Sequence, residues 1–191
     1  MEKNIVNKVN IYVEKLNEDI ILPEYSNKGD AGMDIRASKD IIILPGETKL
    51  VPTGIKLSIP EGYQIEVRPR SGLSLNTPLR ISNTPGTIDS GYKDEIGIIV
   101  SNTSPVIILN SKEDPLTKEI TYTLPSYSKD KLYTLEEKGN KYGGYLIKKN
   151  DRIAQIVLTK YSEINFTLVK ENSISNMGNN RGGGFGHSGI I

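Results

Sequence analysis

Apolar residues along this chain recur in short alternating or continuous runs, and few stretches have the spacing of an amphipathic helix. Val9, Ile11 and Val13 alternate with polar neighbours, the pattern of a half-buried strand. Turn formers such as Pro45-Gly46 close several of the runs. The other runs predicted as strands cover residues 41–44, 54–59, 64–68, 96–100, 106–109, 120–124, 153–158 and 164–169. Many short strands at spacings of about ten residues predict an all-β fold, a barrel or sandwich of the jelly-roll kind.

The composition narrows the classes to which this sequence can belong. Its 191 residues suit a single domain, and 24 Lys and Arg against 23 Asp and Glu leave a net charge of +1. This balance argues against binding to nucleic acid or to a membrane surface, and no apolar run approaches the roughly 18 residues of a spanning helix. Without cysteine and with one histidine, His187, disulfides, thiolate nucleophiles and multi-histidine metal sites are excluded. The charged N-terminus lacks the pattern of a signal peptide, so we expect a cytoplasmic protein.

Glycine combines with charged or hydroxyl residues in four segments, whereas a plain β domain needs it only at turns. In Arg70-Ser71-Gly72 a cation, a hydroxyl group and an unhindered amide follow one another. The segment can therefore be a turn that binds phosphate oxygens, or it can be an ordinary polar loop. The glycine-rich C-terminal segment suits a disordered tail or a lid over a nucleotide. The four segments cover residues 31–37, 68–74, 83–92 and 181–189.

Asp89 stands between an apolar residue and Ser90-Gly91-Tyr92, at a predicted hairpin turn. Its carboxylate can stabilise this turn by bonding to its own backbone, or it can act as a general base that deprotonates water. Tyr92 can pack its flat ring against a sugar, or it can be a core or surface tyrosine. The residues themselves leave these alternatives open.

Taken in order, these segments and residues 151–158 resemble the five motifs of the homotrimeric dUTPases. The matching sequences are AGMDIRA, RPRSGLS, NTPGTIDSGY, DRIAQIVL and RGGGFGHSG. The resemblance spans residues 9–102 and 150–189. It implies a jelly-roll-like β domain that forms a homotrimer with three shared active sites and C-terminal tail exchange. It also implies hydrolysis of dUTP to dUMP and pyrophosphate, which keeps uracil out of DNA and supplies dUMP for thymidylate synthesis.

The resemblance further implies roles for individual residues. Asp89 would activate the water molecule that attacks the α-phosphate, and Tyr92 would stack under the deoxyribose and exclude a ribose 2′-hydroxyl group. Asp34 would order the water ligands of a Mg²⁺ ion that is held chiefly by the three phosphates. The implied substrate-binding residues are Arg70, Ser71, Gly72 and Gln155 at the phosphates, Asn83, Gly86, Thr87, Ile88 and Gly97 at the uracil, and Arg181, Phe185, Gly186 and Ser188 in a flexible lid, residues 172–191, that arrives from another subunit.

Residues 103–149 exceed the length of the corresponding connection in the family, so we predict an insertion there. A long insertion on a rigid scaffold is often a binding loop, and it can equally be a tolerated surface hairpin. The alternative function is therefore a dUTP-binding regulatory protein that contacts a protein partner through residues 103–149. The run 120–124 and the positions of Tyr133, Tyr145 and Ile147 predict additional β structure in this segment.

Two further readings fit the sequence less well. The dCTP deaminases resemble the same fold, and they carry a catalytic glutamate ten residues after the shared aspartate. This chain has Ile99 at that position, and isoleucine cannot transfer a proton. A β-sandwich interaction module without chemistry would have no need of five nucleotide-like motifs.

Overall fold

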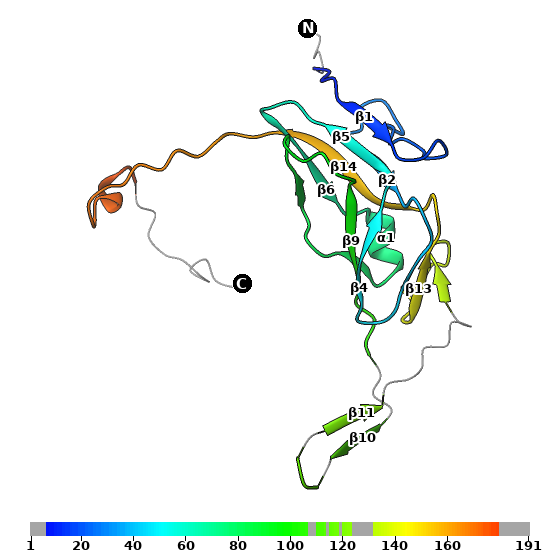
Figure 1. The fold of residues 1–191 in the computed structure, drawn as a ribbon. Coiled ribbons are helices and arrows are strands. Elements are labelled where there is room, and N and C mark those ends of the chain that lie inside the picture. Colours follow the sequence, from blue (N-terminus) through cyan, green and yellow to red (C-terminus); the bar gives the residue numbers. More distant parts are fainter. Residues whose placement is uncertain (1–6, 107–109, 114, 119, 124–131, 180–191) are drawn as a thin grey trace. The chain divides into compact units, whose positions relative to one another are not determined.

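The computed structural model describes residues 7–106, 110–113, 115–118, 120–123 and 132–179. Nearly all regular structure in these residues is β (Figure 1), which confirms the predicted all-β class. The exceptions are the helix α1 (Ser71–Asn76) and one 3₁₀ turn (Ile174–Asn176). No helix among the described residues is long and apolar enough to cross a membrane.

The largest sheet has four antiparallel strands in the order β2-β14-β6-β8. Its register places Asp34 opposite Gln155 and Gln155 opposite Arg68, so three polar residues form one row across the sheet. Alternate positions of the same strands, such as Ile35 and Val67, are buried. The strands are β2 (Gly32–Arg36), β6 (Tyr63–Arg68), β8 (Gly86–Ile88) and β14 (Arg152–Lys160).

Two three-stranded sheets supply most of the remaining core. One has the order β4-β9-β7, and the other has the order β12-β13-β3, with β12 and β13 parallel. Their inward side chains include Val51, Ile98 and Val100 from the first, and Ile43 and Tyr145 from the second, all at most 1 % exposed. The strands are β3 (Ile41–Ile43), β4 (Thr48–Pro52), β7 (Leu79–Ile81), β9 (Gly97–Asn102), β12 (Leu132–Thr134) and β13 (Gly144–Ile147).

Four further strands form two small antiparallel pairs, β1 with β5 and β10 with β11. They are β1 (Tyr12–Lys15), β5 (Ile55–Ser58), β10 (Asn110–Glu113) and β11 (Ile120–Thr123). By its contacts the chain divides into residues 1–161 and residues 162–191. The described part of the second unit holds only the 3₁₀ turn.

The structure corrects several predicted elements. Residues 164–169 were expected to form a strand because their apolar positions alternate, yet the structure assigns them no regular element. The first strand begins at Tyr12, so Val9 and Ile11 precede it, and Val106 lies outside any strand. Residues 107–109, the rest of that predicted strand, and Leu124 fall outside the described residues.

The additional β structure expected within residues 103–149 is present as β10, β11, β12 and β13. Tyr145 and Ile147 of β13 are fully buried in the main core. The C-terminal part of this segment is therefore integral to the domain. The boundaries of an insertion stay a prediction.

Candidate functional site

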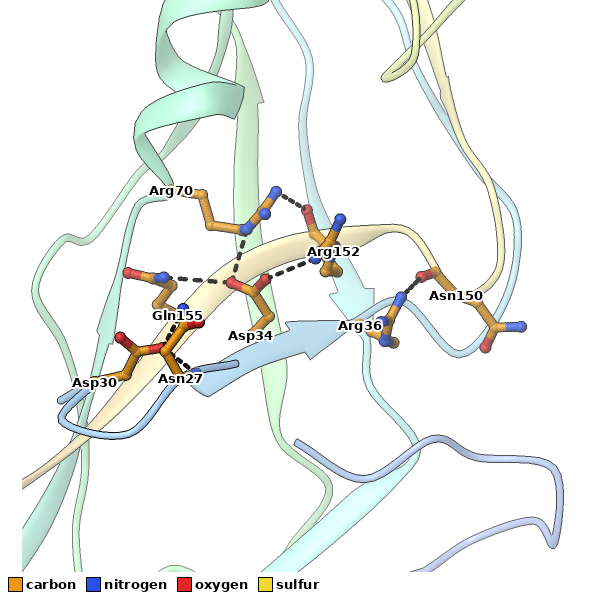
Figure 2. A network of polar contacts seen from close by, with 8 residues as sticks. All are labelled: Asn27, Asp30, Asp34, Arg36, Arg70, Asn150, Arg152 and Gln155. Carbon is orange, nitrogen blue, oxygen red and sulfur yellow. Dashed lines mark hydrogen bonds and ion pairs between the residues drawn. The ribbon is translucent and has the colours of Figure 1, made fainter. Parts of the chain in front are cut away.

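Asp34 on β2 is the centre of a polar cluster that joins three of the singled-out segments (Figure 2). Its Oδ1 accepts a hydrogen bond from Arg70 Nε at 2.8 Å and from Gln155 Nε2 at 3.3 Å. Its Oδ2 lies 3.5 Å from an Arg152 guanidinium nitrogen. The Arg70 guanidinium also donates a hydrogen bond to the Arg152 carbonyl oxygen at 3.2 Å, so Arg70 and Arg152 are linked directly. The structure thus brings together Asp34, Arg70 and Gln155, which the sequence analysis selected from separate segments.

Charge and burial at this cluster suit an anionic ligand. Two guanidinium groups face one carboxylate, and the Asp34 side chain is 13 % exposed against 25 % for Arg70 and 50 % for Arg152. The cations thus stay accessible while the carboxylate that orients them is mostly covered. A pocket of about 330 Å³ opens beside the cluster, and its lining includes Asp30, Asp34, Arg68 and Gln155. Arg68 itself pairs with Glu66 on the same strand at 2.6 Å.

Ser71 and Gly72 form the first turn of α1, directly after Arg70. Both residues are exposed, and a β-carbon built at Gly72 would meet nothing within 4 Å. Their hydroxyl and amide groups are therefore accessible next to the Arg70 guanidinium. The residue types left a phosphate-binding turn and an ordinary polar loop open for this segment, and the helix was not predicted.

Asn83 and Gly86 lie against each other at the start of β8. A β-carbon at Gly86 would lie 3.1 Å from Asn83 Nδ2 and 3.4 Å from the Val67 β-carbon. Any side chain at this position would therefore displace the Asn83 amide. Within β8, Thr87 is exposed and Ile88 is buried, so Thr87 is the side chain that this strand presents outward.

Asp89 follows β8 immediately, and its carboxylate is exposed. A turn begins there, because the Tyr92 amide donates to the Asp89 carbonyl oxygen at 3.1 Å. None of the described residues donates a hydrogen bond to the Asp89 carboxylate, so the backbone supports the turn without it. The Tyr92 hydroxyl donates to the Glu95 carbonyl oxygen at 2.9 Å, and Glu95 Oε1 accepts from the Gly54 amide at 2.7 Å. Residues 89–96 are thereby fixed to the loop between β4 and β5.

Gly97, the first residue of β9, has a structural reason of its own to be glycine. A β-carbon there would lie 2.5 Å from Leu50 Cδ1, on the neighbouring strand β4. Leu50 is 63 % exposed. The Leu50 side chain therefore lies directly over the Gly97 backbone on the outward face of this sheet.

Some contributors to the cluster were not predicted from the sequence. Arg152 belongs to the cluster although only Gln155 was selected from its segment, and Asp30 and Arg68 line the adjacent pocket. A register shift between Arg152 and Ala154 changes the alternation of side chains along β14. The predicted tail residues, Arg181, Phe185, Gly186 and Ser188, fall outside the described residues.

Comparison with known sequences identifies the family. The family model for dUTPase matches residues 18–117. A deoxyuridine 5′-triphosphate nucleotidohydrolase from Clostridioides difficile is 37 % identical over 181 residues, which cover 95 % of this chain and 99 % of that protein. The chain belongs to the dUTPase family. Its relative from Fusobacterium nucleatum is 38 % identical over 174 residues, 90 % of this chain and 92 % of that protein.

Solved dUTPase structures from staphylococcal phages share the fold. A variant of the Staphylococcus bacteriophage 80alpha dUTPase, solved with dUpNHpp, covers 96 % of this chain and 100 % of its own, with a TM-score of 0.72 and 29 % identity. The dUTPase from S. aureus phage phi11, which has a species-specific insert, covers 86 % of this chain and 99 % of its own, with a TM-score of 0.65 and 30 % identity. These similarities agree with the predicted jelly-roll-like dUTPase domain.

Proposed function

We propose that this chain hydrolyses dUTP to dUMP and pyrophosphate, by attack of water on the α-phosphate with Asp89 as the general base. The meeting of Asp34, Arg70 and Gln155 in one cluster carries the proposal, because three dUTPase motifs converge there on a surface with accessible cations. The sequence relatives are deoxyuridine 5′-triphosphate nucleotidohydrolases. The cytoplasmic location stays a prediction.

Arg70, Ser71, Gly72 and Gln155 would hold the triphosphate, with Arg152 as an additional cation. A guanidinium group offers several donors in a fixed plane and stays charged at any physiological pH, which suits phosphate oxygens. Phosphoryl transfer depends mainly on positioning and on neutralising charge, and this cluster can do both.

A Mg²⁺ ion would bind this surface together with the substrate, whose phosphates would supply most of its ligands. The described residues contain no group of three or more His, Cys, Asp and Glu that could hold a metal ion. Asp34 already accepts from Arg70 and Gln155, so its carboxylate can reach a cation through water while the phosphates supply direct ligands. When bound, the ion would neutralise charge on the triphosphate. A structural Mg(II) ion is known in the phage phi11 dUTPase.

Asn83, Tyr92 and the backbone of residues 86–88 and 97 would form the nucleoside end of the site. Close packing of Asn83 on Gly86 leaves amide and backbone groups as the surface that a uracil edge would meet. Asp89 would take a proton from water as the water oxygen bonds to the α-phosphorus. The bond to the bridging oxygen of the β-phosphate then breaks, and pyrophosphate leaves.

The register of the large sheet supports a site shared between subunits. Asp34 lies in the row of Arg68, whereas Asp89 follows Ile88, which pairs with Ile65 at the other end of β6. Three strand spacings and about four residues along β6 separate Asp34 from Asp89, roughly 20 Å. The α- and γ-phosphorus atoms of one nucleotide are far closer than this. The two ends would therefore come from different copies, as in a homotrimer.

The segment after β14 supports an exchanged C-terminal tail. Ile164, Phe166 and Leu168 alternate with polar residues along it. Alternating apolar side chains of this kind suit a covered face, and in an exchanged tail another copy of this chain would cover them. Such an exchange would carry Arg181, Phe185, Gly186 and Ser188 to a neighbouring site.

The test is to incubate the purified protein with Mg²⁺ and dUTP, dCTP, dTTP or UTP and to measure pyrophosphate and the nucleotide products. We expect dUMP and pyrophosphate from dUTP alone. Asp89→Asn should abolish turnover and leave binding of dUpNHpp largely intact, because the amide cannot take the proton. Turnover of Asp89→Asn at the rate of the unmodified protein would remove Asp89 from the mechanism.

A second candidate function is regulation through residues 103–149. Phage dUTPases, with that of Staphylococcus bacteriophage 80alpha as the solved example, are described as controlling the transfer of virulence genes. Contact with a protein partner through residues 103–149 would be additional to catalysis here, since Asp89 is intact. Pull-downs with the full chain and with a chain lacking residues 110–123 would separate the two functions, because catalysis alone predicts identical sets of bound proteins.

A further inference from the structure

The helix α1, whose first turn carries Ser71 and Gly72, buries one of its six residues. Leu73 is its buried residue, at 5 % exposure, while Leu75 is 76 % exposed. A helix of six residues gains little stability from its own backbone hydrogen bonds. Contacts at its two ends therefore matter for where Ser71 and Gly72 lie.

One of these contacts comes from the loop between β12 and β13, residues 135–143, which we name the Asn140 loop. The loop is tied down at both ends. Glu137 Oε1 accepts from the Thr134 amide at 3.1 Å, and its Oε2 pairs with Lys141 Nζ at 3.3 Å. The Tyr145 hydroxyl donates to the Lys141 carbonyl oxygen at 2.9 Å, and the Gly143 amide donates to Ser104 Oγ at 3.0 Å.

At the tip of the loop, the Asn140 amide donates a 2.7 Å hydrogen bond to the carbonyl oxygen of Asn76, the last residue of α1. The Asn76 side chain in turn donates from Nδ2 to the Gly72 carbonyl oxygen at 2.9 Å. Two consecutive hydrogen bonds thus link the Asn140 loop to the turn that carries Ser71 and Gly72.

Asn140 adopts a conformation that has a cost in free energy. Its φ is 50°, in the left-handed region that a β-carbon disfavours. Its side-chain Oδ1 is buried and accepts no hydrogen bond in the structure. What this conformation achieves is to aim the backbone N–H of Asn140 at the end of α1.

We propose that Asn140 is a positioning residue for the triphosphate, acting through Asn76 on Ser71 and Gly72. This inference rests on the proposed function, because it takes the first turn of α1 as the phosphate-binding turn. It makes residues 135–143, which lie in the segment longer than the usual family connection, a support of the active site. The uracil end is built from β8 and β9 and has no part in this chain of hydrogen bonds.

The test compares Asn140→Ala with Asn140→Gly. Both remove the side chain, but glycine accepts the left-handed φ and keeps the N–H in place, whereas alanine disfavours it. We expect Asn140→Ala to weaken binding of dUpNHpp by about three- to tenfold and to leave binding of dUMP within twofold of the unmodified protein. Asn140→Gly should restore binding of dUpNHpp.

Asn76→Ala interrupts the same chain at its second hydrogen bond, and it keeps the inference testable if Asn140→Ala fails to fold. We expect the same selective loss for dUpNHpp, with KM for dUTP raised more than kcat is lowered. Unchanged dUpNHpp binding in both variants, or equal losses for dUpNHpp and dUMP, would overturn the positioning role. Absence of dUTP hydrolysis and of dUpNHpp binding in the unmodified protein would instead overturn the proposed function, and this inference with it.

Discussion

Gly86 shows how one missing side chain shapes the proposed nucleoside end. A β-carbon at this position would press on Asn83 Nδ2 at 3.1 Å and on the Val67 β-carbon at 3.4 Å. Since Val67 belongs to the core, the Asn83 amide is the group that must move. We expect Gly86→Ala to raise KM for dUTP several-fold, about 1 kcal/mol of lost binding, with a smaller effect on kcat. Steady-state kinetics measure both quantities.

Gly91 offers the matched control for that substitution. It lies between Asp89 and Tyr92, yet a β-carbon there would meet nothing within 4 Å, and its φ is not in the left-handed region. Gly91→Ala should therefore keep KM near that of the unmodified protein. If Gly86→Ala and Gly91→Ala behaved alike, the contact between Asn83 and Gly86 would have no role in substrate binding.

The partly buried carboxyl group of Asp151 should make the stability of the folded protein depend on pH. Burial raises the pKa of this carboxyl group above its ordinary value of 3.8, although its oxygen accepts a hydrogen bond from the Lys148 amide at 2.8 Å. For a raised pKa, the stability that the group contributes is present below the ordinary value and is lost as pH rises through the raised value. The ionised side chain therefore destabilises the folded state at neutral pH.

Asp151→Asn removes this charge and keeps an oxygen for the Lys148 amide. We expect a higher Tm than that of the unmodified protein at neutral pH, and a difference that shrinks as pH falls below about 4. Thermal unfolding followed by circular dichroism across this range measures the effect. A lower Tm for Asp151→Asn at neutral pH would show that the ionised carboxylate stabilises the fold.

At the scale of elements, several strands could be predicted where a run rich in β-branched residues becomes buried, whereas β2, β4, β7 and β8 were not predicted. Residues 153–158 are such a run, and they lie within β14. The helix α1 could not be predicted, because its sequence SGLSLN consists largely of poor helix formers and has one buried residue. Residues 164–169 alternate as a strand does, but they form no regular element in the structure. Alternating apolar and polar residues predict an apolar face that packs against something, but they do not identify its partner.

The candidate site, too, could be predicted in part from the sequence. Asp34, Arg70 and Gln155 could be selected because they stand in motifs, and the register of β2 and β14 brings two of them together. Arg152 was missed because the register shift beside it cannot be read from residue types. A bulge changes the direction of one side chain while the hydrophobic pattern stays almost unchanged.

The pairing of β2 with β14 supplies a matched control, Arg36, for testing whether Arg152 binds the triphosphate. Arg36 and Arg152 face each other in the register, but the Arg36 guanidinium donates to the Asn150 carbonyl oxygen at 2.7 Å instead of joining Asp34 (Figure 2). We expect Arg152→Ala to weaken dUpNHpp binding by about tenfold, or 1.4 kcal/mol, with Arg36→Ala close to the unmodified protein. Equal effects of the two substitutions on titration calorimetry would assign Arg152 a structural role only.

At the scale of the whole molecule, a site divided between copies predicts complementation. Asp89→Asn should be inactive because the base is lost, and Arg70→Ala because Asp34 and the phosphates lose a cation. Each chain keeps the half that the other has lost. If every site takes Asp89 from one copy and Arg70 from another, refolding the two variants together at equal amounts should restore about one quarter of the sites, the product of two independent chances of one half. Sites built within single chains would stay inactive at every mixing ratio. Activity that rises with the product of the two fractions, measured as pyrophosphate release, is therefore the signature of a shared site.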